Sequence, residues 1–143
     1  MPKCLLVGVD GSDSGNRALE FARGRAEDLG ATLVLAHVIP WSPYSFNTPE
    51  ENEQRHARRK EELAAAEEQL LGPARERAGD GLEVVTVAKH GDRAETLNEL
   101  AEEHGADHII VGRTGESRLR SKFFGSVPSE LTMIADVPVT VVP

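Results

Sequence analysis

The sequence has only one cysteine, Cys4, so no disulfide can form within the chain, and a reducing, cytoplasmic location fits this. No apolar run approaches the roughly 20 residues of a membrane-spanning helix. The apolar stretch near the N-terminus runs into Asp10 rather than a small-residue cleavage site, so we expect a strand there and not a signal peptide. Positive charge is also scarce. The formal net charge of −8 argues against general binding to nucleic acids or anionic membranes.

Two common phosphate-binding motifs are absent as well. The pattern G-x-x-x-x-G-K-[ST] occurs nowhere, which excludes a P-loop. The first predicted strand is followed by GVDGSDSG and not by G-x-G-x-x-G, the dinucleotide-binding fingerprint. A phosphate site in this chain must therefore use another motif.

What the chain does have is a regular alternation of short apolar runs and longer segments with helical spacing. A length of 143 residues predicts one domain, residues 1–143. Strands separated by helices predict a parallel sheet with right-handed crossovers. The predicted strands are 4–9, 32–39, 82–89, 108–112 and 138–143, and the predicted helices are 14–29, 49–78, 93–104 and 127–135. The helix over 49–78 is charged and mostly solvated, and we expect Gly72-Pro73 to kink or interrupt it.

Sheets of this kind bind ligands outside the carboxyl ends of their strands. Three segments lie at the ends of predicted strands or directly after them and should meet at that edge: 10–12, 37–39 and the loop that starts at Gly112. Asp10 could accept hydrogen bonds from a nucleoside amine or a ribose hydroxyl. Its position in a D-G-S turn slightly favours the alternative, an aspartate that bonds its own backbone.

The loop GRTGESRLRSKFFGS, residues 112–126, combines spaced glycines with positive charge in an acidic chain. Glycines allow backbone N–H groups to approach a phosphate closely, and Gly125 and Ser126 open a predicted helix whose N-terminus favours an anion. The intervening Arg118, Arg120 and Lys122 either bias the local field or close over the phosphates. A surface loop with turn glycines and solvated charges explains the same residues equally well.

Gly112-x-x-Gly115, nine residues and then Gly125-Ser126 match G-2x-G-9x-G-[ST], and on this motif the chain resembles the universal stress protein family. The resemblance extends over VGVDGSDSGNRAL, LVLAHVI, HGDRAETLNELAEEHGADHIIVG and VPVTVVP, which is nearly the whole chain. It implies an α/β fold: a three-layer, open, parallel five-stranded sheet of order 3-2-1-4-5. This is a flavodoxin- or Rossmann-like arrangement, similar to the adenine nucleotide alpha hydrolases.

Because the full signature is present, the resemblance implies the ATP-binding branch of the family, with ATP, ADP or AMP as ligand and Mg arriving with the nucleotide. By this resemblance Asp10 contacts the nucleoside and Val38 contacts adenine, largely through its backbone. The phosphates would be surrounded by Gly112, Arg113, Gly115, Gly125, Ser126 and Val127.

The sequence departs from the family pattern at two positions. Relatives often have Ser-His, Ser-Arg or Thr-Arg between the first two glycines, whereas this chain has Arg113-Thr114, so Arg113 points either to phosphate or to solvent. Many relatives have proline where this chain has Arg93, a change that we expect to matter little for chemistry.

Two aromatic residues follow the second predicted strand. Trp41 and Tyr44 either cover a base or pack on the protein's own surface.

We expect a nucleotide-responsive stress or regulatory protein with slow or no hydrolysis and no catalytic or metal-binding residues of its own. One alternative is a weak ATPase or a self-phosphorylating protein with Ser126 or Thr114 as acceptor. Another is a protein–protein interaction module whose loop is empty.

The valines of 138–142 form a predicted edge strand, and relatives commonly pair this strand across a two-fold axis, so the resemblance favours a homodimer.

Overall fold

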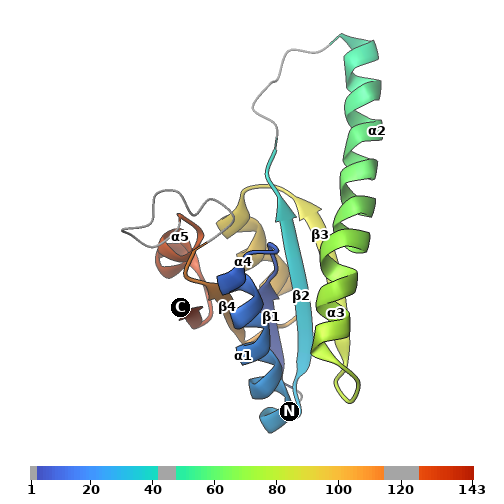
Figure 1. Ribbon diagram of the computed structural model, residues 1–143. Helices are drawn as coiled ribbons and strands as arrows, with labels where there is room; N and C mark the ends of the chain where they lie inside the picture. The colour runs from blue at the N-terminus through green and yellow to red at the C-terminus, as the bar shows by residue number, and fades with distance from the viewer. Residues whose placement is uncertain (1–2, 42–47, 115–125) are drawn as a thin grey trace.

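The computed structural model describes residues 3–41, 48–114 and 126–143. Within these ranges a five-stranded, wholly parallel sheet runs in the order β3-β2-β1-β4-β5, with helices on both faces (Figure 1). This confirms the predicted fold class and strand order. The strands are β1 (Cys4–Gly8), β2 (Thr32–Ile39), β3 (Val84–His90), β4 (His108–Gly112) and β5 (Val139–Val142). The helices are α1 (Asp13–Leu29), α2 (Pro49–Ala66), α3 (Gly72–Ala78), α4 (Arg93–Glu103) and α5 (Ser126–Ile134), with a π-helical turn, η1 (Glu67–Leu71), between α2 and α3.

The strands alternate their side chains between two apolar layers, as the pleat requires. On one face, Leu5, Val7, Leu33 and Leu35 pack with α1, η1 and α3. On the other face, Leu6, Val34, Ile109 and Val111 of the sheet pack with apolar residues of α4 and α5. Both faces of the central strands are covered, which explains why β1, β2 and β4 read as continuous apolar runs rather than alternating ones.

Local signals set the ends of α1. The Ser12 hydroxyl accepts a hydrogen bond from the Gly15 N–H at 3.0 Å and so satisfies a free donor of the first turn. Gly30 ends the helix with φ +64°, a left-handed conformation that glycine adopts without penalty. The helix therefore starts directly behind the carboxyl end of β1.

The long charged helix is interrupted where the sequence predicts, by a π-helical turn. The Gly72 N–H bonds to the Glu67 carbonyl, five residues back, instead of following the usual four-residue spacing. Pro73 has no N–H to donate and its ring would meet the carbonyl four residues earlier in a regular helix. The wider turn just before Pro73 lets the chain continue into α3 without that clash.

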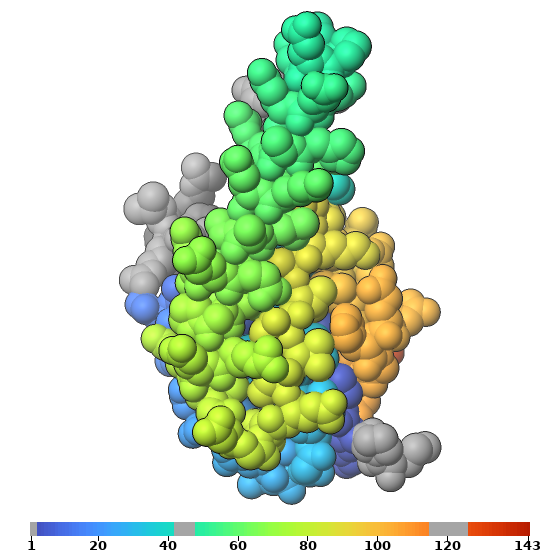
Figure 2. All heavy atoms as spheres, turned by 90° about the vertical axis from the view of Figure 1, so that its right-hand side faces the viewer, coloured from blue at the N-terminus to red at the C-terminus, as the bar shows by residue number. Residues whose placement is uncertain are grey.

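Helix α2 extends past the carboxyl edge of the sheet and stands clear of the body (Figures 1 and 2). Ala66 is its only buried residue, in agreement with the predicted solvated helix. Its start is fixed by a capping box in which Thr48 and Glu51 exchange side-chain to backbone hydrogen bonds. The described part of the chain contains no helix long and apolar enough to cross a membrane.

Candidate functional site at the carboxyl edge of the sheet

The turn between β1 and α1 is built around the Asp10 carboxylate. Its Oδ1 accepts hydrogen bonds from the Ser12 N–H at 3.0 Å and from the Ser12 hydroxyl at 2.6 Å. Gly15 lacks a side chain where one would collide with that same oxygen. Asp10 therefore does bond its own turn through Oδ1. Its other oxygen, Oδ2, forms no hydrogen bond to a described residue and is available to a ligand.

The first turn of α1 also holds the start of the 112–126 loop. The Ser14 hydroxyl accepts from the Thr114 N–H at 3.2 Å and donates to the Thr114 carbonyl. Gly112 lies so close to this turn that a Cβ there would be 2.5 Å from Ser14 Oγ and 2.7 Å from the Gly15 nitrogen. In this structure, Gly112 is thus required by the packing of β4 on α1, a role distinct from the one that its motif suggests.

Strand β2 is longer than its neighbour β1 at this edge. Pairing of the two strands ends at Gly8 and Ala36, whereas pairing of β2 with β3 continues to Ile39 and His90. The Ala36 carbonyl accepts from the Val9 N–H, so alternate residues of β2 present their backbone groups to the β1 side. By this alternation the N–H and C=O of Val38 face the space beyond the end of β1, while its side chain is buried against the α4 layer. The backbone of Val38 is thus available to a planar group lying there.

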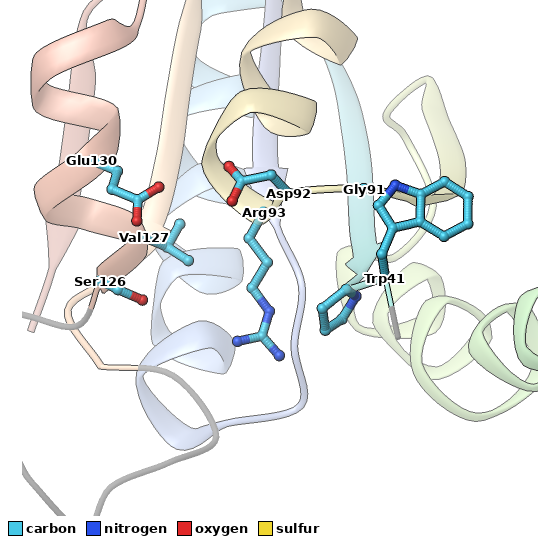
Figure 3. A pocket seen from close by; sticks show the side chains of 8 residues that line it. Trp41, Gly91, Asp92, Arg93, Ser126, Val127 and Glu130 are labelled. Atoms are coloured by element: carbon cyan, nitrogen blue, oxygen red, sulfur yellow. The ribbon is translucent and has the colours of Figure 1, made fainter. Parts of the chain in front are cut away.

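A pocket of about 360 Å³ opens on the α4–α5 side of the same edge (Figure 3). Three segments form it: the residues after β2, the start of α4 and the start of α5. Of the described residues, those that line it are Pro40, Trp41, Gly91, Asp92, Arg93, Ser126, Val127 and Glu130. This volume lies within the range of small-molecule sites.

The wall formed by Trp41 is fixed from the side of α2. The indole stacks on the ring of His90, with centroids 5.2 Å apart and planes at 22°, and the guanidinium carbon of Arg59 lies 4.8 Å from the indole centroid. His90 in turn lies 3.2 Å from the Glu62 carboxylate. The contacts fit the expectation that Trp41 packs on the protein's own surface, and they connect the projecting helix to the pocket. Tyr44 lies outside the described residues.

The wall opposite Trp41 is formed by the N-termini of α4 and α5. The Asp92 carboxylate caps α4 by accepting from the Glu95 N–H at 3.1 Å. Ser126 is the first residue of α5 and Val127 packs partly into the core beneath it. The positive end of the dipole of each of these two helices favours a negatively charged group near this wall.

Apart from Gly112, which packs on α1, the predicted site residues have different places in the structure. Ser126 and Val127 line the pocket, and Asp10 and Val38 lie at the ends of the adjoining strands. Arg113 has an exposed side chain that does not line the pocket, and its N–H bonds to the Val142 carbonyl at 2.7 Å. Gly115 and Gly125 lie outside the described residues, as do Arg118, Arg120 and Lys122.

No sequence pattern indicates that Arg93, Asp92 and Glu130 meet in one pocket. They come from the starts of two different helices, and only the packing of α4 beside α5 brings them together. The contact of Ser14 with Thr114 was not predicted either, although a serine two residues after a helix cap has a hydroxyl that can donate a hydrogen bond to a neighbouring segment. Across the described ranges, no group of three or more histidine, cysteine or carboxylate side chains could hold a metal ion.

Comparison with known proteins places this architecture in a family. A universal stress protein from Thermus aquaticus is 31% identical over 99% of this chain and 99% of its own length. The structure of the universal stress protein UspA from Lactobacillus plantarum, 24% identical, covers 99% of this chain and 97% of its own with a TM-score of 0.83. A universal stress protein solved in complex with cAMP is 27% identical and superimposes with a TM-score of 0.63, over 99% of this chain and 96% of its own. The family model for the universal stress proteins matches residues 1–143, and the chain therefore belongs to the universal stress protein family.

Proposed function

We propose that this protein binds an adenine nucleotide, ATP or its products ADP and AMP, at the carboxyl edge of its sheet, as in the ATP-binding branch of the family. It would act as a nucleotide-responsive stress or regulatory protein with slow or no hydrolysis. The observation that carries this proposal is the pocket in which Ser126, the last residue of the G-2x-G-9x-G-[ST] signature, and Val127, which follows it, face the segment after β2. The solved complex of a 27% identical family member with cAMP supports an adenine nucleotide as the ligand class.

In this proposal the nucleoside lies over the ends of β1 and β2. Oδ2 of Asp10 accepts a hydrogen bond from ribose, and the backbone of Val38 meets the adenine edge. The phosphates extend toward the start of α5, where Ser126 offers its hydroxyl and N–H together with the helix dipole. Gly115 and Gly125 would complete the phosphate cradle. Mg would arrive bound to the phosphates, since the described residues supply no cluster for it.

Calorimetric titration with ATP and MgCl₂, combined with a phosphate-release assay on the same sample, tests the proposal. We expect saturable binding with little or no phosphate release. The absence of both heat and thermal stabilisation at millimolar ATP would leave an interaction module with an empty loop as the better account. Turnover well above buffer background, lost in Gly125→Val, would instead support an ATPase.

The two halves of the proposed site can be separated by mutation. Asp10→Ala should weaken adenosine and ATP to a similar degree, because it removes a contact to the nucleoside. Gly115→Val should weaken ATP far more than adenosine, because it obstructs the phosphate side only. Equal losses for both ligands in both variants would contradict this division.

We also propose a homodimer formed through β5. This strand is an edge of the sheet in the described chain, and all four of its residues are only half-buried. The Pro138 carbonyl accepts from Ile109 of β4 and the Val142 carbonyl from Arg113, directly after β4, so by alternation the N–H groups of Val139 and Val141 face outward. Val141→Pro would remove one outward N–H without removing a bond to β4, and it should convert a dimer to a monomer in analytical ultracentrifugation. A monomeric wild-type chain at micromolar concentration would refute the proposal.

A further inference from the structure

Arg93 is the one basic residue among the described residues that line the pocket. It is the first residue of α4, and its side chain is exposed. No described carboxylate lies within ion-pair distance of it, and no hydrogen bond joins its guanidinium to a described residue. Two other arginines, by contrast, are engaged: Arg17 bonds the Pro143 carbonyl, and Arg75 bonds the Val84 carbonyl. Arg93 therefore has its full donor capacity available in the pocket.

The direction of the side chain matters as much as its freedom. Figure 3 shows Arg93 extending from the start of α4 across the pocket, with Ser126 and Val127 on one side and Trp41 on the other. A ligand that reaches from the segment after β2 to the start of α5 must pass this guanidinium. The planar fork of arginine matches two oxygens of a phosphate, and a pair of charge-assisted hydrogen bonds forms without rearrangement of the backbone.

Among the described lining residues, the remaining charges of the pocket favour such a cation for an anionic ligand. Asp92 and Glu130 also line it, and both carry negative charge. Asp92 is partly neutralised because it caps α4, whereas Glu130 is exposed and forms no ion pair with a described residue. Two carboxylates would repel a phosphate that lacked a cationic partner, and the helix N-termini offset only part of this repulsion.

We propose that Arg93 donates charge-assisted hydrogen bonds to a phosphate of the bound nucleotide and thereby makes the pocket select phosphorylated nucleotides over the nucleoside. This inference rests on the proposed function of the site and adds to it a selectivity residue outside the glycine signature. The α-phosphate is sufficient for the contact, so AMP should benefit from Arg93 as well as ATP.

Isothermal titration of the full chain with adenosine and with AMP tests this, using wild type, Arg93→Ala, Arg93→Lys and Arg25→Ala. Arg25 is the matched control, because it is an exposed helical arginine that does not line the pocket. Arg93→Ala should weaken AMP about tenfold at low salt, the lower end expected for hydrogen bonds to charged groups, and leave adenosine within about twofold. Arg93→Lys keeps the charge and should lose less than Arg93→Ala. Arg25→Ala should match wild type for both ligands.

The outcomes separate this inference from the function on which it rests. If wild type binds AMP and Arg93→Ala binds it equally well, Arg93 is no ligand and the inference fails while the proposed function stands. Equal weakening of adenosine and AMP would assign Arg93 to the nucleoside and would also overturn the inference. An Arg93→Lys variant as weak as Arg93→Ala would refute the role of charge. Failure of wild type to bind either ligand would overturn the proposed function itself.

Discussion

Replacing Gly112 by alanine should destabilise the fold, because its packing leaves no room for a methyl group. The new Cβ would be 2.5 Å from Ser14 Oγ, 2.6 Å from the Ser14 carbonyl carbon and 2.7 Å from the Gly15 nitrogen. Two of these atoms belong to the backbone of α1, which cannot rotate away as a flexible side chain can. Strand β4 and the first turn of α1 must therefore move apart.

The size of the effect follows from the cost of overpacking. One extra methyl group in a well-packed region typically costs about 1–3 kcal/mol. We expect about 3 kcal/mol, at the upper end of that range, because the clash is with backbone and because separation strains the Ser14–Thr114 hydrogen bonds. For a chain of this length 1 kcal/mol corresponds to about 3 °C in Tm, so the midpoint should fall by about 9 °C.

Thermal unfolding followed by circular dichroism measures this, with Gly24→Ala as the control. Gly24 lies inside α1 and has no atom within 4 Å of the position of an added Cβ. Alanine should therefore stabilise the helix there by about 1 kcal/mol, through helix propensity alone. A Gly112→Ala variant as stable as wild type would refute the packing argument. It would leave phosphate binding, the role that its motif suggests, as the better explanation of Gly112.

Three further predictions concern single side chains. Ser14→Ala should lower the free energy of unfolding by about 1–3 kcal/mol, because it leaves the Thr114 N–H without its partner and the Thr114 carbonyl with only the longer, 3.4 Å bond from the Ser12 hydroxyl; a chemical denaturation midpoint equal to that of wild type would contradict this. Glu130→Gln should tighten AMP binding, because it removes a carboxylate from the pocket, and should leave adenosine unchanged; weaker AMP binding would show that Glu130 helps to hold the ligand. Burial raises the pKa of the Cys4 thiol, and the Asp107 carboxylate raises it further, so alkylation by iodoacetamide at neutral pH should be slower than for a free thiol. Asp107→Asn should lower that pKa and speed the reaction at a fixed pH between neutrality and the pKa; an unchanged rate would exclude the charge as a cause.

Much of the carboxyl edge could be anticipated from sequence, because parallel strands all end on the same side. The segments after β1, β2 and β4 each carry a polar or glycine-rich turn, and their meeting follows from the βαβ pattern without knowledge of side-chain contacts. The helix interruption near Gly72-Pro73 was predictable for a similar local reason, since proline cannot complete a regular turn.

The contacts that shape the site were not predictable, because they join residues far apart in the chain. Gly112 and Ser14 are brought together only by the packing of β4 on α1. Arg93 was expected to matter little, and nothing in its neighbouring sequence indicates that α5 starts across a pocket from it. The stacking of Trp41 on His90 likewise depends on the pairing of β2 with β3.

The central claim, that an adenine nucleotide binds at the carboxyl edge, is tested most directly by two-dimensional NMR of the ¹⁵N-labelled chain during titration with AMP. The account predicts shifts for the backbone amides of Val38, Gly91 and Ser126 and for the indole N–H of Trp41, the only tryptophan. Glycines at the opposite ends of the strands and helices, Gly30 and Gly105, should not move. No shifts at millimolar AMP, or shifts confined to the opposite edge, would contradict it.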